Sequence, residues 1–139
     1  MAISQSMCAS FKSEVLGGIH DLDTDTIKIA LYTSSATLGS GTTAYSATNE
    51  VSGTGYTAGG NTLTSPAISL DGTTAVVNFA DSTWSTATIT ARGALIYNAS
   101  KSNRAIAVLD FGEDKTSTSG NFTVQFPAAA ASTAIVRLA

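Results

Sequence analysis

The stretch TIKIALYT, residues 26–33, indicates the fold class most clearly. It follows an acidic run, Asp21–Asp25, after which the apolar side chains recur with a period of two. This spacing places Ile27, Ile29 and Leu31 on one face of an extended chain. The pattern therefore predicts a strand over residues 26–33.

Residues 34–65, which follow this strand, contain apolar side chains spread thinly among serine, threonine and glycine. The glycine-rich run over residues 53–60 is typical of a loop. A loop of this length in a compact domain often has a function, and we expect it to form surface or contact structure. After it, Asp71-Gly72-Thr73 lies between two alternating segments, 67–70 and 74–79, and indicates a β-hairpin.

The second half of the chain is predicted to be a succession of strands. Arg92-Gly93 is expected to form a bulge, and residues 112–115 are expected to form a turn. Pro127 cannot donate a backbone hydrogen bond, so it ends any central pairing there. The strands are expected over residues 86–91, 94–97, 104–111, 121–126 and 133–138.

One short helix is predicted before the acidic run. Ser6 is a suitable N-cap, and Gly17-Gly18 supplies a stop signal. The segment is compatible with two arrangements: a helix packed on its own domain, or an arm that docks on a neighbouring subunit. Apolar residues recur between these signals at helical spacing and form one stripe, which consists of Met7, Phe11, Val15 and Leu16.

The length of 139 residues predicts one domain. We expect a mainly β fold, a single antiparallel β-sandwich or open barrel with a short N-terminal helix. Residues 1–25 are assigned to the helix or arm. Residues 26–139 are assigned to the β-sandwich domain, which includes a long loop at about 34–65.

The composition excludes several classes of protein. Only 12% of the residues are charged and the net charge is −3, whereas about 25% is usual. Serine and threonine make up about a quarter of the chain, so the surface is either rich in hydroxyl groups or covered by other chains. We expect no nucleic-acid groove, because the few basic residues are scattered. No apolar run is long enough for a transmembrane helix, so no membrane partner is expected. The single cysteine, Cys8, fits a chain made in a reducing cytoplasm.

Residues that could carry chemistry are few. His20 is the only histidine, and a cap or packing role is favoured over catalysis because no nucleophile motif accompanies it. Asp21, Asp23 and Asp25 resemble the start of a calcium loop whose glycine and final glutamate are missing, so a solvated connection is favoured. Cys8 lies on the helical stripe and is expected to be a buried structural thiol. We therefore expect no catalytic residue, no cofactor and no metal, and the chain is not expected to be an enzyme.

A strand-rich chain with little charge is typical of a protein that binds other proteins through broad surfaces. A few large side chains then contribute most of the binding energy. An exposed aromatic platform for sugars is the alternative for the tyrosines and Trp84, and packing is favoured over it. The predicted interface residues are Met7, Phe11, Val15, Tyr45, Tyr56 and Trp84.

Five runs together resemble a family of small virion proteins of tailed bacteriophages. They are LGGIHD at 16–21, KIALYTS at 28–34, GTGYTAGG at 53–60, ARGALIY at 91–97 and VQFPA at 124–128. The resemblance extends over nearly the whole chain, and the motifs are specific as a set and weak singly. Members of this family look like structural proteins of the phage particle, and the resemblance supplies no catalytic residues.

The resemblance implies a capsid decoration, or cement, protein that binds the outer head shell and stabilises it across capsomer junctions. It implies the major capsid protein as partner, and a homo-oligomer that is a trimer by analogy with decoration proteins at three-fold positions. The expected location is the capsid surface of the virion, after synthesis in the host cytoplasm. The alternative is a structural protein of the tail or baseplate, or one that binds the host surface.

Overall fold

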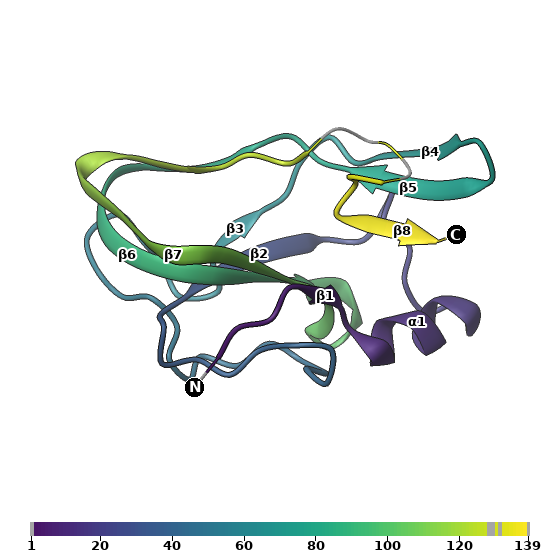
Figure 1. Ribbon diagram of the computed structural model, residues 1–139, viewed down its shortest axis with the longest axis horizontal. Helices are drawn as coiled ribbons and strands as arrows, with labels where there is room; N and C mark the ends of the chain where they lie inside the picture. The colour runs from purple at the N-terminus through teal and green to yellow at the C-terminus, as the bar shows by residue number, and fades with distance from the viewer. Residues whose placement is uncertain (1, 128–129, 131, 139) are drawn as a thin grey trace.

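The computed structural model describes residues 2–127, 130 and 132–138. These residues form eight strands, one α-helix and one 3-10 helix (Figure 1). In chain order the elements are β1 (Ser6–Met7), α1 (Ala9–Leu16), β2 (Ile27–Tyr32), β3 (Asn61–Thr62), β4 (Ala67–Asp71), β5 (Thr74–Asn78), β6 (Ser82–Asn98), η1 (Ala99–Lys101), β7 (Arg104–Val124) and β8 (Val136–Leu138).

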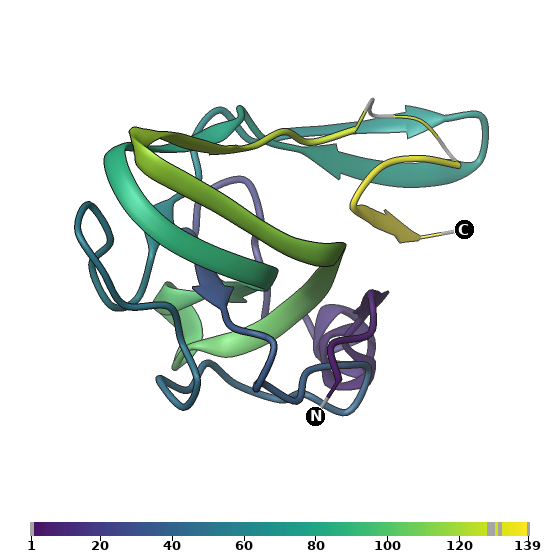
Figure 2. The ribbon, with the colours of Figure 1, turned by 60° about the vertical axis from the view of Figure 1, so that its left-hand side comes forward.

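The larger sheet is antiparallel and has the strand order β1-β7-β6-β2-β3. Its centre is the β6–β7 ribbon, whose strands of 17 and 21 residues exceed the usual strand length of about 3–10. The ribbon curls over the rest of the sheet (Figure 2). Strand β2 pairs with β6 along its full length, and Ile29 lies opposite Ile96. The predicted strand over 26–33 is therefore confirmed as β2.

The smaller sheet has the order β4-β5-β8 and is also antiparallel. The predicted hairpin is confirmed: Asp71 pairs with Thr74 across the turn, and Gly72 has a φ of 64°, as primed hairpin turns require. This sheet extends from the main body above α1 (Figure 2). The two sheets and the short helix confirm the predicted fold class, and the described residues form no closed barrel.

Two predictions about strand boundaries are wrong. The strands expected at 86–91 and 94–97 are one strand, β6. The register shifts at the predicted position, between Ala91 and Gly93, but the extra residues belong to β7. The turn expected at 112–115 is instead a bulge within β7. Pairing steps from Ala91↔Lys115 to Gly93↔Asp110, so several residues of β7 lie opposite Arg92 alone. Pairing with β6 resumes on both sides of this bulge, so the chain does not reverse direction.

The core lies between β2, β6, β7 and the segments that cover them. Strand β2 is buried on both faces, with Ile29, Ala30 and Leu31 fully inaccessible to solvent. The 34–65 segment contributes to this core through Ala36, Val51 and other buried side chains. The expectation that this segment forms surface or contact structure is therefore wrong for these residues, which pack in the core. A few small apolar groups suffice, because the backbone of the segment pairs with β2, as in the hydrogen bond from the Val51 amide to the Leu31 carbonyl of 2.9 Å.

The N-terminal segment packs on its own chain. Ser6 is not the helix cap, because it belongs to β1 and pairs with Val108 of β7. The helix begins instead after Cys8, whose side chain makes no capping bond. Phe11 is 1% exposed, whereas Leu16 is 91% exposed and does not belong to the buried stripe. The helix ends at the predicted Gly17-Gly18 pair, where backbone hydrogen bonds close its last turn.

Candidate functional site

The six predicted interface residues are divided between the core and its margin. Phe11 and Trp84 are 1% and 3% exposed, so neither is available on the surface of this chain. The other four, Met7, Val15, Tyr45 and Tyr56, are partly buried and pack against the core. Pattern alone could not separate these roles, because an aromatic side chain is equally suited to a core and to an interface. The interface itself stays a prediction.

The tyrosines converge on one carboxylate, Glu50. It accepts hydrogen bonds from the hydroxyls of Tyr45 (2.7 Å) and Tyr56 (2.5 Å) and from the Gly59 amide (2.8 Å). Burial, together with Glu50, raises the pKa values of Tyr45 and Tyr56 well above their usual range. Both hydroxyls therefore stay protonated and act as donors. These hydrogen bonds join different parts of the 34–65 segment to each other. They do so beside Val51, where the backbone of the segment pairs with β2.

A second aromatic contact joins this segment to the larger sheet. The rings of Tyr45 and Tyr97 stack with centroids 4.7 Å apart, and the Tyr97 hydroxyl donates to the Gly59 carbonyl at 2.7 Å. The ring centroids of Trp84 and Tyr56 lie 6.0 Å apart, and the Trp84 ring contacts the Phe122 ring edge-on. These aromatic side chains pack inside the chain and do not form an exposed stacking platform for sugars.

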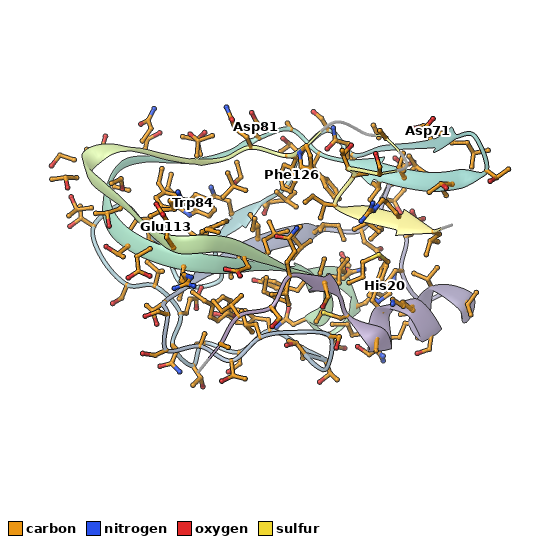
Figure 3. All side chains as sticks on the ribbon, in the orientation of Figure 1. His20, Asp71, Asp81, Trp84, Glu113 and Phe126 are labelled. Carbon is orange, nitrogen blue, oxygen red and sulfur yellow. The ribbon has the colours of Figure 1, made fainter. Side chains whose placement is uncertain are left out.

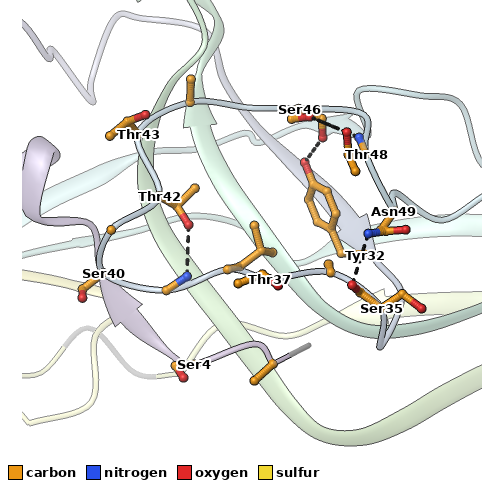
Figure 4. Close-up of a pocket in the computed structure, with 16 residues that line it drawn as sticks. Ser4, Tyr32, Ser35, Thr37, Ser40, Thr42, Thr43, Ser46, Thr48 and Asn49 are labelled. Atoms are coloured by element: carbon orange, nitrogen blue, oxygen red, sulfur yellow. Dashed lines mark hydrogen bonds between the residues drawn. The ribbon is translucent and has the colours of Figure 1, made fainter.

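A hollow of about 860 Å³ lies between the first part of the long segment and the N-terminus (Figure 4). None of the described residues that line it is charged, and most carry hydroxyl groups. Several of these hydroxyls are already bonded within the loop. The Tyr32 hydroxyl donates to the Ser46 carbonyl at 2.6 Å, and Thr42 accepts from the Gly39 amide at 3.0 Å. The hollow therefore offers polar contacts but no acid, base or nucleophile poised for catalysis.

His20 belongs to a polar network that joins α1 to β6 and β7. Its Nε2 lies 2.9 Å from a Glu14 carboxylate oxygen, and its Nδ1 lies 3.0 Å from the Asn98 amide nitrogen. The Asn98 carbonyl oxygen accepts from the Ser100 amide, so the amide nitrogen donates to His20 Nδ1. The ring therefore donates through Nε2 to Glu14. Its side chain is fully buried, so this arrangement confirms a packing role.

Glu14 and Asp25 anchor the two ends of this network. Burial raises the pKa of Glu14, but its bonds to His20 and Arg104 outweigh this and lower it overall. The pKa of Asp25 falls to about 2, because Asn98 donates to its carboxylate at 2.8 Å and Lys101 forms an ion pair with it at 2.8 Å. Each buried charge or amide in the network thus has a partner, as a stable buried network requires.

The acidic run before β2 is a hydrogen-bonded connection. Asp21 accepts from the amides of Asp23 and Thr24, and Asp25 accepts from the amide of Asp21. Such local side-chain bonds are typical of Asx turns. Among the described residues, no group of three or more histidine, cysteine or acidic side chains is arranged to hold a metal ion.

Neither Cys8 nor Glu113 of β7 belongs to a cluster of residues that could perform catalysis. Cys8 is fully buried, and this burial raises the pKa of its thiol to about 11, which keeps it protonated and unreactive. Glu113 lies at the far end of the β6–β7 ribbon from His20 (Figure 3). It forms an exposed ion pair with Lys115 at 3.1 Å. No helix in the described part of the chain is long and apolar enough to cross a membrane.

The exposed face of the β6–β7 ribbon carries cross-strand pairs of threonine hydroxyls. Thr83 lies 3.0 Å from Thr123, and Thr90 lies 2.9 Å from Thr116. These hydroxyls bond to each other across the ribbon, so these positions are polar without carrying charge.

Three residues that organise these clusters were not predicted from the sequence: Glu50, Asn98 and Arg104. Asn98 and Arg104 meet partners far away in sequence, as His20 and Asn98 do across 78 positions, whereas Glu50 meets Tyr45, Tyr56 and Gly59 within its own loop. Asn98 and Arg104 give only the signal of polar residues beside apolar runs, and Glu50 gives only that of one acidic residue in a loop rich in hydroxyl groups. Comparisons of the chain with protein-family models, with curated proteins and with solved structures find no match.

Proposed function

We propose that the chain is a non-enzymatic structural protein of a bacteriophage virion. Its proposed role is capsid decoration: it binds the major capsid protein on the outer head shell and stabilises the shell across capsomer junctions. The resemblance of five sequence runs to small virion proteins suggests this class. The proposal includes a homo-oligomer, with a trimer as the form suggested by analogy.

The observation that carries the proposal is how the buried polar side chains are used. The described clusters around Glu50 and Asp25 bond within the chain and stabilise its fold. The solvent-exposed surface is rich in hydroxyl groups and carries little charge. Such a surface suits binding to another protein over a broad area. A shell has many equivalent positions, so many copies of a small chain can together stabilise it.

The copy number in purified particles tests this proposal. We expect densitometry of particle proteins to give a number of copies comparable with that of the major capsid protein. A copy number on the order of a dozen would contradict the decoration role, because that is the number of a tail or vertex component. It would favour the tail, baseplate or host-surface alternative.

A further inference from the structure

The four edges of the two sheets differ in how they are protected. In the described residues, β1 and β3 are edge strands of two residues each, and β8 is an edge strand of three residues that carries Arg137. Very short edges and edge charges are the usual protections against pairing with another chain. Strand β4 has five residues, all of them exposed; its one charged residue, Asp71, stands at the turn end, and no lysine, proline or bulge interrupts the strand.

The apolar residues of β4 are directed to one face. Ile68 and Leu70 are 56% and 72% exposed, and they lie opposite Val77 and Ala75 of β5. Paired residues share a face of an antiparallel sheet, so this face continues into β8 through Leu138, which is 41% exposed. Among the described residues, no strand pairs with the outer edge of β4, which carries alternating apolar side chains.

The direction of the unpaired groups follows from the hairpin. Asp71 and Thr74 close a two-residue turn, so they form a hydrogen-bonded pair, and bonded pairs alternate along the ladder. Ser69 then bonds to β5, whereas Ile68 and Leu70 direct their N–H and C=O groups outward. Ile68 and Leu70, with Ser69 between them, can therefore form backbone hydrogen bonds with Leu70 and Ile68 of an antiparallel strand of the same sequence.

We propose that β4 pairs antiparallel with β4 of a second copy of this chain, about a two-fold axis at Ser69. Ile68 of each copy then lies opposite Leu70 of the other, and the outward backbone groups of both strands are satisfied. The two three-stranded sheets become one continuous sheet of six strands. This contact goes beyond the proposed function, since it follows from the edge alone and is independent of what the chain decorates.

The charge distribution on β4 favours a second copy as the occupant. Asp71 is the strand's only charged residue, and in this register it lies opposite Ala67 of the other copy. The two Asp71 residues are then four positions apart, or about 14 Å at 3.4 Å per residue. This exceeds the screening length of about 10 Å at 0.1 M salt, so the two carboxylates repel only weakly. The contact is small compared with the roughly 800 Å² per partner of a standard interface, so the dimer forms reversibly.

Sedimentation equilibrium of the wild-type chain over a range of concentrations tests the association. We expect a reversible two-fold association of the free chain, separate from any trimer formed on the shell. We expect Leu70→Lys to raise its dissociation constant by roughly tenfold, because it places a charge at the paired edge. Leu16→Lys is the matched control, since Leu16 is exposed but lies on α1. A monomer at every concentration overturns the proposal. So does an oligomer that Leu70→Lys leaves unchanged, or one that Leu16→Lys weakens equally.

Disulfide cross-linking tests the register. In the proposed dimer the two Ser69 residues form a non-hydrogen-bonded pair, whose Cα atoms lie about 4.5 Å apart, within the range that a disulfide spans. Mild oxidation of Ser69→Cys is therefore expected to give a covalent dimer. Thr62→Cys, on the exposed edge strand β3, is the control and is expected to stay monomeric. Native Cys8 is buried and does not interfere. Equal cross-linking of the two variants, or none of Ser69→Cys, overturns the register.

Discussion

Replacement of Phe11 by alanine is predicted to destabilise the whole chain by about 3 kcal/mol. Phe11 is 1% exposed, belongs to the main core cluster, and lies 4.9 Å from the His20 ring. Loss of a buried phenylalanine usually costs about 3–5 kcal/mol. We expect the lower end of this range, because Phe11 also lines a hollow of about 370 Å³ under the smaller sheet, where neighbours can adjust.

Urea unfolding, followed by the fluorescence of the single tryptophan Trp84, measures this loss. With a slope of about 1.5–2 kcal/mol per molar urea, the unfolding midpoint should fall by about 1.5–2 M. Leu16→Ala is the control on the same helix: Leu16 is 91% exposed, so the change should be within about 0.5 kcal/mol. If Phe11→Ala costs no more than Leu16→Ala, the helix is not part of the core, and the arrangement as a docking arm would be supported. Deletion of residues 1–18 is expected to unfold the chain for the same reason.

Three further perturbations test the clusters and the backbone. The carboxylate of Asp25 has a folded-state pKa near 2, below its ordinary 3.8, so it stabilises the fold above about pH 4 and this contribution is lost as the pH falls toward 2. Asp25→Asn should therefore flatten the acid limb of a stability–pH curve; an unchanged limb would contradict the network. Glu50→Gln should cost about 1.5–3 kcal/mol in urea unfolding, because it leaves a buried donor without an acceptor, whereas exposed Glu113→Gln should cost less than about 0.5 kcal/mol. Gly60→Ala should prevent folding or greatly lower the thermal midpoint, because its Cβ would lie 1.8 Å from the Ile29 carbonyl oxygen. Gly72→Ala is the control, since its Cβ would meet no atom within 4 Å. Equal thermal midpoints of the two variants would refute this placement of residue 60.

Local signals in the sequence predicted those elements that are defined by their own residues. Strand β2 follows from the alternation in residues 26–33, and the β4–β5 hairpin follows from Asp71-Gly72 between two alternating segments. Neither prediction depends on the rest of the chain. Both elements appear within one or two residues of the expected positions.

Elements that depend on a distant partner could not be predicted in this way. Residues 112–115 have the composition of a turn, but the pairing of β7 with β6 on both sides holds them in a bulge. Strand β1 is two residues long and exists because Ser6 lies beside Val108. The burial of Trp84 and the hydrogen bonds to Glu50 likewise arise only when the long 34–65 segment folds against the sheets.

The position of this chain in a reconstruction of the phage particle tests the proposed function most directly. We expect many copies of a small β-sandwich on the outside of the head, at the junctions between capsomers. Density for the chain only in the tail or baseplate, or its absence from the head surface, would contradict the account.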